Sequence, residues 1–266
     1  MILELGLGLL IGLIMALTGA GGGILAVPLL VFGAQLSVAE AGPVGLVAVG
    51  IAAALGAALG LKTGIVRYRA ALLMAGTGVL LSPLGILLAR RVDNRWLSLL
   101  FALVLLAVAY RTFRQAQQTL PASGENHDLA LPCVRNKDSG RFVWTSRCAG
   151  ALAASGAVAG MLSGLLGVGG GFVLVPVLRR FSDLAAQSII ATSLTVIALV
   201  SGSAVLFSAA SGNLDWNIAL PFSAGALAGM AGGRLIASRL PAAGLQKGFA
   251  GVAAIVAVGM LVKSLA

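Results

Sequence analysis

Charged side chains are scarce in this sequence, and histidine is almost absent. Only 10% of the 266 residues are charged, whereas a soluble domain has roughly 25%. By contrast, 59% of the residues are hydrophobic and the mean hydropathy is +1.04. No Asp, Glu, Lys or Arg lies deep in any of the apolar runs that recur along the chain. This composition excludes a soluble domain with a single anchor and predicts a polytopic membrane protein.

Cysteine and histidine are too few to build a catalytic or metal centre. The two cysteines, Cys133 and Cys148, show no CxxC or Cys/His spacing, so we expect no metal site, no cofactor and no required disulfide. The one histidine, His127, lies in a polar linker, so no Ser–His pair can form inside the membrane. We therefore expect that the protein is not an enzyme. The alternative is a membrane-embedded enzyme or a structural subunit of a membrane complex.

Acidic residues are also few, which leaves a formal net charge of +10. Such an excess can indicate nucleic-acid binding. In an apolar chain, however, Lys and Arg collect in the loops on the cytoplasmic side of a membrane. We therefore expect no nucleic-acid partner. The expected location is the cell (inner) membrane, with several passes through the lipid bilayer.

The apolar runs divide the chain into two similar halves. A bilayer core needs about 20 apolar residues per helix. On that basis we predict eight hydrophobic segments at about 2–32, 41–61, 70–89, 96–110, 148–178, 184–210, 216–237 and 248–262. Residues 1–110 form an N-terminal transmembrane repeat and residues 148–266 a C-terminal one. The polar linker between them, 111–147, is predicted to be cytoplasmic.

Two glycine-rich breaks interrupt the first and fifth segments. The first break (19–23) and the second break (167–171) match glycine for glycine, and each is followed at the same distance by a proline, Pro28 or Pro176. Each glycine costs about 1 kcal/mol in a helix relative to Ala, so both segments should be broken. In a membrane such a break must line a cavity or be buried in protein, and paired breaks in two halves indicate a transport site. The alternative is close helix packing, which we expect for 225–229.

The basic residues favour a re-entrant path for the two broken segments. If all eight segments cross the membrane, Lys and Arg are shared almost equally between its two faces. If the first and fifth segments bend back at their breaks, all but four of the 18 basic residues lie on one face; the four are Arg90, Arg91, Arg95 and Lys263. The positive-inside rule favours the second arrangement. The predicted fold is an all-α integral membrane protein of two inverted four-segment repeats.

Several motifs resemble one known family. They are the doubled GxGGG-x-x-x-x-P pattern, Ala191-Thr192-Ser193-Leu194, and the Pro-x-Gly and Gly-Gly-Arg ends of the third and seventh segments. On these residues the chain resembles the sulfite exporter TauE/SafE group of membrane permeases, over nearly its whole length outside the linker. The resemblance implies a secondary carrier (permease or exporter) of small sulfur-containing anions such as sulfite, thiosulfate or organosulfonates.

The candidate anion site combines the breaks with two hydroxyls. A helix that begins after Gly23 or Gly171 presents unpaired N–H groups and a positive dipole end to an anion. The first half has 43–47, without hydroxyls, where the family pattern has Thr-Ser, so any hydroxyl contribution comes from Thr192 and Ser193. The predicted substrate-binding residues are Gly19, Gly21, Gly22, Gly23, Gly167, Gly169, Gly170, Gly171, Thr192 and Ser193.

The hydroxyls in the apolar segments and the charge of the substrate lead to further expectations. Thr18 and Ser163 should bond to carbonyls of their own helices, as membrane hydroxyls usually do. No Lys or Arg is near either break in the sequence, so the expected substrate is a monoanion; a dianion would need an added cation or a borrowed arginine such as Arg234. The direction of transport, the coupling ion and a homo-oligomeric state stay open.

Overall fold

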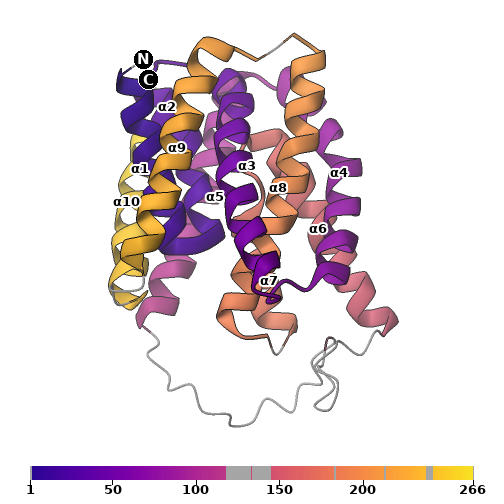
Figure 1. The fold of residues 1–266 in the computed structure, drawn as a ribbon. Helices are drawn as coiled ribbons and strands as arrows, with labels where there is room; N and C mark the ends of the chain where they lie inside the picture. Colours follow the sequence, from indigo (N-terminus) through magenta and orange to yellow (C-terminus); the bar gives the residue numbers. More distant parts are fainter. Residues whose placement is uncertain are drawn as a thin grey trace.

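The structure is a computed structural model that describes residues 2–117, 133, 145–182, 184–212, 214–237 and 242–265. The described residues are helical almost throughout (Figure 1). The elements in chain order are α1 (Ile2–Thr18), the 3-10 helix η1 (Gly19–Leu25), α2 (Ala26–Gly33), α3 (Val38–Lys62), α4 (Tyr68–Arg91), α5 (Asn94–Gln117), α6 (Ser146–Leu166), α7 (Gly171–Phe181), α8 (Ala186–Ala210), α9 (Trp216–Ala237) and α10 (Ala242–Leu265).

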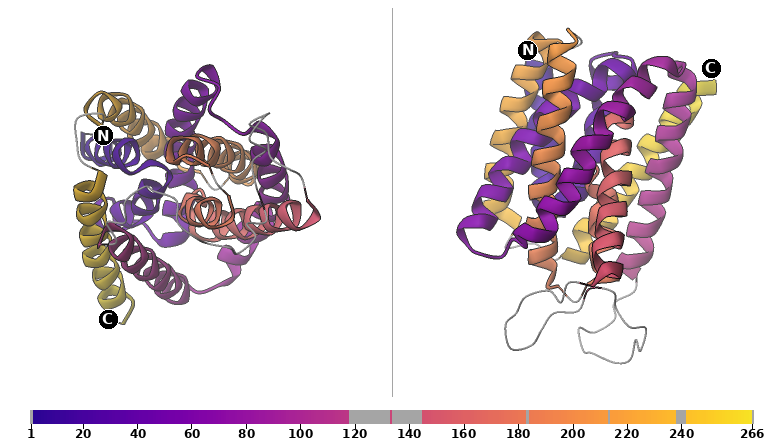
Figure 2. Two further views of the ribbon diagram at one scale, coloured as in Figure 1. Left: turned by 90° about the horizontal axis from the view of Figure 1, so that it is seen from below. Right: turned by 90° about the vertical axis from the view of Figure 1, so that its right-hand side faces the viewer.

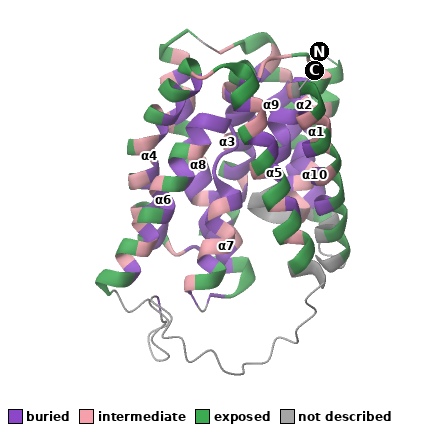
Figure 3. Cartoon of the chain, turned by 180° about the vertical axis from the view of Figure 1, so that it is seen from behind, coloured by how far each residue is buried: buried purple, intermediate pink, exposed green. Residues whose placement is uncertain are grey.

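Six of these helices are long and apolar enough to cross a membrane. They are α3, α4, α5, α6, α8 and α10, while Ile2–Leu17 and Gly22–Gly33 are shorter apolar helices. Buried residues gather inside the bundle and exposed ones on its outside (Figure 3). The outside is itself apolar: Leu80, Leu206 and Ile255 are all more than 70% exposed. The protein is therefore an all-helical, multi-pass membrane protein.

The two ends of the bundle carry different parts of the chain. We call the end where α5 finishes and α6 begins the linker end, and the opposite end, where both termini lie, the terminal end (Figure 1). Helices α3, α5, α7 and α9 finish at the linker end, and α4, α6, α8 and α10 begin there (Figure 2). The described loops and helix ends that carry most of the basic residues thus share one end, as the re-entrant arrangement requires.

The chain reverses at each break. Cys133 is disulfide-bonded to Cys148 at the start of α6, and its N–H donates to the carbonyl of Phe181 at the end of α7, 3.2 Å away. The hairpin α6–α7 therefore begins and ends at the linker end. In the other half, a Cβ placed on Gly33 at the end of α2 would lie 2.5 Å from Cδ1 of Leu7 in α1. The hairpin of α1 and α2 therefore begins and ends at the terminal end.

The disulfide between Cys133 and Cys148 was not predicted from the sequence. The expectation of no required disulfide rested on the absence of a local spacing pattern, but Cys133 lies beside Ser182 at the end of α7 and is bonded to Cys148 in α6. Both side chains are fully buried. Disulfides persist in oxidising compartments and are rare in the cytosol. The bond therefore conflicts with the predicted cytoplasmic location of the linker.

Glycines pack two pairs of helices backbone to backbone. In the pair α1 and α9, a Cβ on Gly225 would collide with the carbonyl of Leu5. In the pair α4 and α6, a Cβ on Gly160 would collide with the carbonyl of Gly78. Small residues allow this approach between membrane helices, so the packing interpretation of 225–229 is confirmed. The offset that relates the two breaks also relates α1 to α6 and α4 to α9, so the two pairs correspond, and each joins a helix of one half to a helix of the other.

Candidate functional site

The second break is a turn of left-handed glycines. Helix α6 ends at Leu166, and Gly167, Gly169 and Gly170 follow with φ of +71°, +79° and +73°. Residues with a Cβ rarely adopt this region, so the conformation requires glycine. Helix α7 starts at Gly171, and no side chain caps its first N–H groups. The second break therefore presents a helix N-terminus inside the bundle, as the sequence predicts.

The first break has a different structure. It forms the 3-10 helix η1, which runs directly into α2. Leu25, the residue before α2, has helical φ and ψ of −83° and −9°. In such a helix, bonds from residue i to residue i+3 give acceptors to the N–H groups that would otherwise be free. The prediction of an open helix N-terminus after Gly23 is therefore wrong, although the glycine patterns of the two breaks are the same.

Position 22 requires glycine because of close packing, and not because of an unusual backbone conformation. Its φ lies outside the left-handed region, unlike that of Gly170. A Cβ on Gly22 would lie 2.7 Å from the backbone nitrogen of Met15, which is a collision. The close contact holds η1 against the end of α1. The two breaks thus use the same residue type for different physical reasons.

The two breaks meet in the middle of the bundle beside α3. A Cβ on Gly23 would lie 3.1 Å from Cγ1 of Val49 and 3.3 Å from the carbonyl oxygen of Val168. A Cβ on Gly169 would lie 3.0 Å from the same Val49 methyl carbon. Val49 is fully buried. The fold therefore brings Gly23 and Gly169, from opposite halves of the chain, to the same side chain.

Ser201 of α8 is the polar side chain that lies against the second break. A Cβ on Gly169 would lie 3.2 Å from its Oγ. Ser201 is fully buried, and its hydroxyl has no hydrogen-bond partner among the described residues. Such a group usually has a protein, water or ligand partner, so Ser201 is a candidate for binding. Sequence reasoning missed it, although it lies about two helical turns beyond Ser193 on the same helix.

Thr192 and Ser193 have partners within the fold. The N–H of Arg67 donates to Oγ1 of Thr192 at 3.1 Å, and Oγ of Ser193 donates to the carbonyl of Ile190 at 2.9 Å. Both side chains are fully buried. Thr192 lies about 7.5 Å along α8 from Ile197, which contacts the second break. The structure thus places Thr192 at the loop between α3 and α4, and a role of these hydroxyls in binding stays a prediction.

Ser163 does not bond to its own helix as expected. Its Oγ is fully buried and has no partner among the described residues. Its backbone carbonyl accepts the N–H of Gly167 at 2.8 Å, which ties it to the second break. Ser82, on the neighbouring helix α4, also has a buried hydroxyl without a described partner. The side chain of Thr18 lies outside the described residues.

Two cavities approach the second break from opposite ends of the bundle. The linker-end cavity has a volume of about 360 Å³ and is lined by Gly171 and Phe172 at the start of α7. The terminal-end cavity has a volume of about 430 Å³ and is lined by Gly164 of α6 and Gly42 of α3. A Cβ on Gly42 would lie 3.5 Å from Cα of Gly167. The second break therefore lies between two cavities that open at opposite ends.

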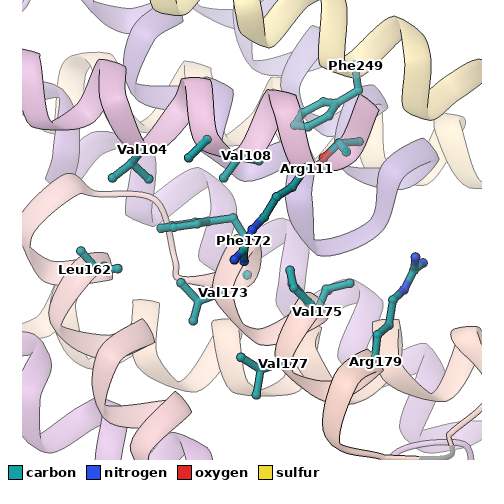
Figure 4. A pocket seen from close by; sticks show the side chains of 14 residues that line it. Val104, Val108, Arg111, Leu162, Phe172, Val173, Val175, Val177, Arg179 and Phe249 are labelled. Atoms are coloured by element: carbon teal, nitrogen blue, oxygen red, sulfur yellow. The ribbon is translucent and has the colours of Figure 1, made fainter. Parts of the chain in front are cut away.

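The two cavities differ in charge. Arg111 of α5 and Arg179 of α7 line the linker-end cavity, and none of the described residues in its wall is acidic (Figure 4). Glu40, Asp215 and Arg90 line the terminal-end cavity. Sequence reasoning missed Arg111 because it is far from both breaks along the chain. The side chain of Arg234, which the sequence offered as a borrowed arginine, lies outside the described residues.

Comparison with known proteins agrees with the motifs. The profile of the family "Sulfite exporter TauE/SafE" matches residues 4–260. The chain belongs to this family. The part of the TauE/SafE chain that matches includes both breaks, the hairpin helices apart from the first two residues of α1, and the hydroxyls of α8. The family resemblance inferred from the motifs is therefore confirmed.

Two relatives of this TauE/SafE chain come from Xylella fastidiosa, strains 9a5c and Temecula1. Each is named "Probable membrane transporter protein" and is 29% identical to this chain, over 244 and 243 residues respectively. The aligned part covers 91% of this chain and 87% of each relative. No solved structure matches the chain. The family and the two relatives together identify the protein as a membrane transporter.

Proposed function

We propose that this TauE/SafE-family protein is a secondary transporter of small sulfur-containing anions such as sulfite, thiosulfate or organosulfonates. The anion binds at the second glycine break, against which the first break packs, and access to it alternates between the two ends of the bundle. The observation that carries the proposal is the position of the second break between two cavities that open at opposite ends, one lined by Gly171 and the other by Gly164.

The chemistry of the second break favours an anion. The N–H groups of Gly171 and Phe172 are the first of α7, and helix geometry leaves them without an acceptor in their own helix. The dipole of a helix adds roughly half a positive charge at its N-terminus. Buried hydroxyls of Ser163 and Ser201 stand nearby without described partners. Together these groups provide hydrogen-bond donors from α6, α7 and α8 to a bound oxyanion.

The first break contributes by packing in this proposal. Gly22 and Gly23 allow η1 to lie close to α1 and to the second break, as their contacts indicate. The roles of Gly19 and Gly21 stay predictions. Thr192 and Ser193 do not contact the anion in this proposal. Their hydrogen bonds help to position α8 and the loop that follows α3. The anion is thus bound mainly by the second half of the chain.

Inverted repeats would supply the two alternating states. Support comes from the hairpins, since the hairpin of α1 and α2 begins at the terminal end and the hairpin of α6 and α7 begins at the linker end. Transporters built from such repeats exchange the conformations of their two halves. Most of the described Lys and Arg residues lie at the linker end, which supports a cytoplasmic position of this end in the cell (inner) membrane.

Flux into proteoliposomes tests the proposal. The purified protein is reconstituted, and uptake of radiolabelled sulfite, thiosulfate and a simple sulfonate is compared with uptake by protein-free liposomes. We expect uptake of at least one of these anions that saturates with concentration and is reduced by the unlabelled anion. If no sulfur-containing anion is taken up faster than in protein-free liposomes, the proposal is wrong.

A further inference from the structure

The linker-end cavity holds two arginines in addition to the helix N-terminus. It lies between α5, α7 and α10 and reaches Gly171 and Phe172 at the start of α7. In Figure 4 the side chain of Arg111 extends from α5 toward Phe172, and Arg179 stands nearer the end of α7. Both arginines are exposed. An anion that enters this cavity therefore passes two guanidinium groups before it reaches the second break.

Neither arginine has a structural partner that would explain its place in the cavity. Neither makes a hydrogen bond or ion pair to a described residue, and the described part of the cavity wall contains no carboxylate. Arg179 lies in the last turn of α7, where a cation is favourable to the helix dipole. Arg180 has the same position in the helix but does not line the cavity. The helix dipole thus explains why a cation lies in the last turn of α7. It does not explain why the side chain of Arg179 lines the cavity.

The corresponding place in the other half has a lysine that already interacts with the protein. A small cavity of about 90 Å³ lies between α2, α5 and α10 at the terminal end and is lined by Arg95 and Lys263. Nζ of Lys263 donates to the carbonyl of Val31 at 3.3 Å and lies 5.6 Å from the ring centre of Phe32. This cavity is small and its lysine caps α2. The linker-end cavity is larger and its arginines are not bound in this way.

We propose that Arg111 and Arg179, together with the N-terminus of α7, form a loading subsite for a doubly charged oxyanion in the linker-end cavity. The proposal rests on the transport function proposed above and adds the charge of the substrate to it. Two guanidinium groups and the α7 N-terminus exceed one positive charge. We therefore propose a dianion as the substrate, whereas the sequence predicted a monoanion. That prediction assumed that no arginine was near the breaks.

Binding to the full-length protein tests this subsite. The protein is placed in nanodiscs of neutral phosphatidylcholine, and the affinity for thiosulfate, a dianion, is compared with that for methanesulfonate, a monoanion. Because charge-assisted hydrogen bonds to an oxyanion are strong, Arg111→Gln and Arg179→Gln should each weaken thiosulfate binding about tenfold. Methanesulfonate binding should change much less. An equal loss for both anions overturns the assignment of a dianion subsite.

Two matched variants control for general effects of charge. Arg114→Gln removes a cation from the same helix as Arg111, but Arg114 stacks on Tyr110 at 5.8 Å and does not line the cavity. Arg180→Gln removes the neighbour of Arg179. Both controls should bind thiosulfate like the wild type. If they weaken binding as much as the cavity variants do, or if the wild type does not bind thiosulfate, the proposal is overturned.

A second lipid composition separates a free anion from a lipid phosphate. If the arginines affect binding only in nanodiscs that contain phosphatidylglycerol, their ligand is a headgroup phosphate and the proposal of a loading subsite is overturned. The binding assay needs no transport. Loss of binding in the cavity variants together with no flux in the wild type would therefore support the subsite and contradict the transport function.

Discussion

The backbone N–H of Arg67 donates a hydrogen bond of 3.1 Å to Oγ1 of Thr192. This bond joins the loop after α3, in the first half of the chain, to α8 in the second half. Ser188, one turn earlier in α8, donates to the carbonyl of Ile65 in the same loop at 2.6 Å. The loop thus lies across the linker end of α8, fixed by two hydroxyls.

Thr192→Val should therefore destabilise the fold. Valine has the shape of threonine but leaves the Arg67 N–H without its partner, which should lower the free energy of unfolding by about 1 kcal/mol. Thermal unfolding in detergent measures the change. Thr195→Val is the matched control, since Thr195 donates only to the carbonyl of Ala191 in its own helix. Unchanged stability together with lost anion affinity would instead make Thr192 a ligand of the anion.

Ser201→Ala should separate stability from binding. The Ser201 hydroxyl is buried without a described partner, so its removal should leave stability unchanged or raise it. Binding and flux of the anion should fall if Oγ is one of its donors. Ser203→Ala, in which the lost hydroxyl donates to the carbonyl of Val200 in its own helix, should alter neither property. Normal flux in Ser201→Ala would show that this serine does not contact the anion.

Gly229→Ala should disrupt the packing of α9 on α1. A Cβ at this position would collide with the carbonyl of Leu9, and such overpacking costs about 1–3 kcal/mol. Gly232→Ala on the same helix, where a Cβ would meet nothing within 4 Å, is the control. Thermal unfolding of the two variants should differ clearly. Equal stability would contradict the close approach of the two helices.

The oxidation state of Cys133 and Cys148 in cells should decide the orientation of the chain. The basic residues favour a cytoplasmic linker end, and cytosolic cysteines are kept reduced. We therefore expect both cysteines to be reduced in cells, so that both thiols, which are buried in the fold, are labelled by a maleimide once acid-quenched cells have been denatured. A disulfide already present in cells, trapped by acid quenching and seen by mass spectrometry, would place the linker end outside.

The helices were largely predictable from the sequence because apolar runs have a fixed length in a membrane. The segment 216–237 coincides with α9, and the predicted segment 70–89 lies within α4. Helix α4 continues through Pro83, although proline lacks the N–H group that the helix would use at this position. The missing N–H of a proline can be accommodated when neighbouring groups compensate, and the sequence does not indicate where they do.

The candidate site was predictable only in part. The glycine pattern located both breaks but could not distinguish the left-handed turn at Gly170 from the 3-10 helix at Gly22, because glycine permits both conformations. Ser201 and Arg111 were missed because they reach the second break only through packing of α8 and α5. The disulfide was missed for the same reason.

Flux of the Gly170→Val variant tests whether the second break is the transport site. Gly170 has φ of +73°, and a Cβ there would lie 2.6 Å from the carbonyl oxygen of Ala159, so valine should distort the second break. Gly150→Val, at a position of α6 where a Cβ meets nothing within 4 Å, is the control. With equal amounts of folded protein in liposomes, we predict that radiolabelled anion uptake is lost in Gly170→Val and kept in Gly150→Val. Uptake at the wild-type rate in Gly170→Val would contradict the claim that the second break is the transport site.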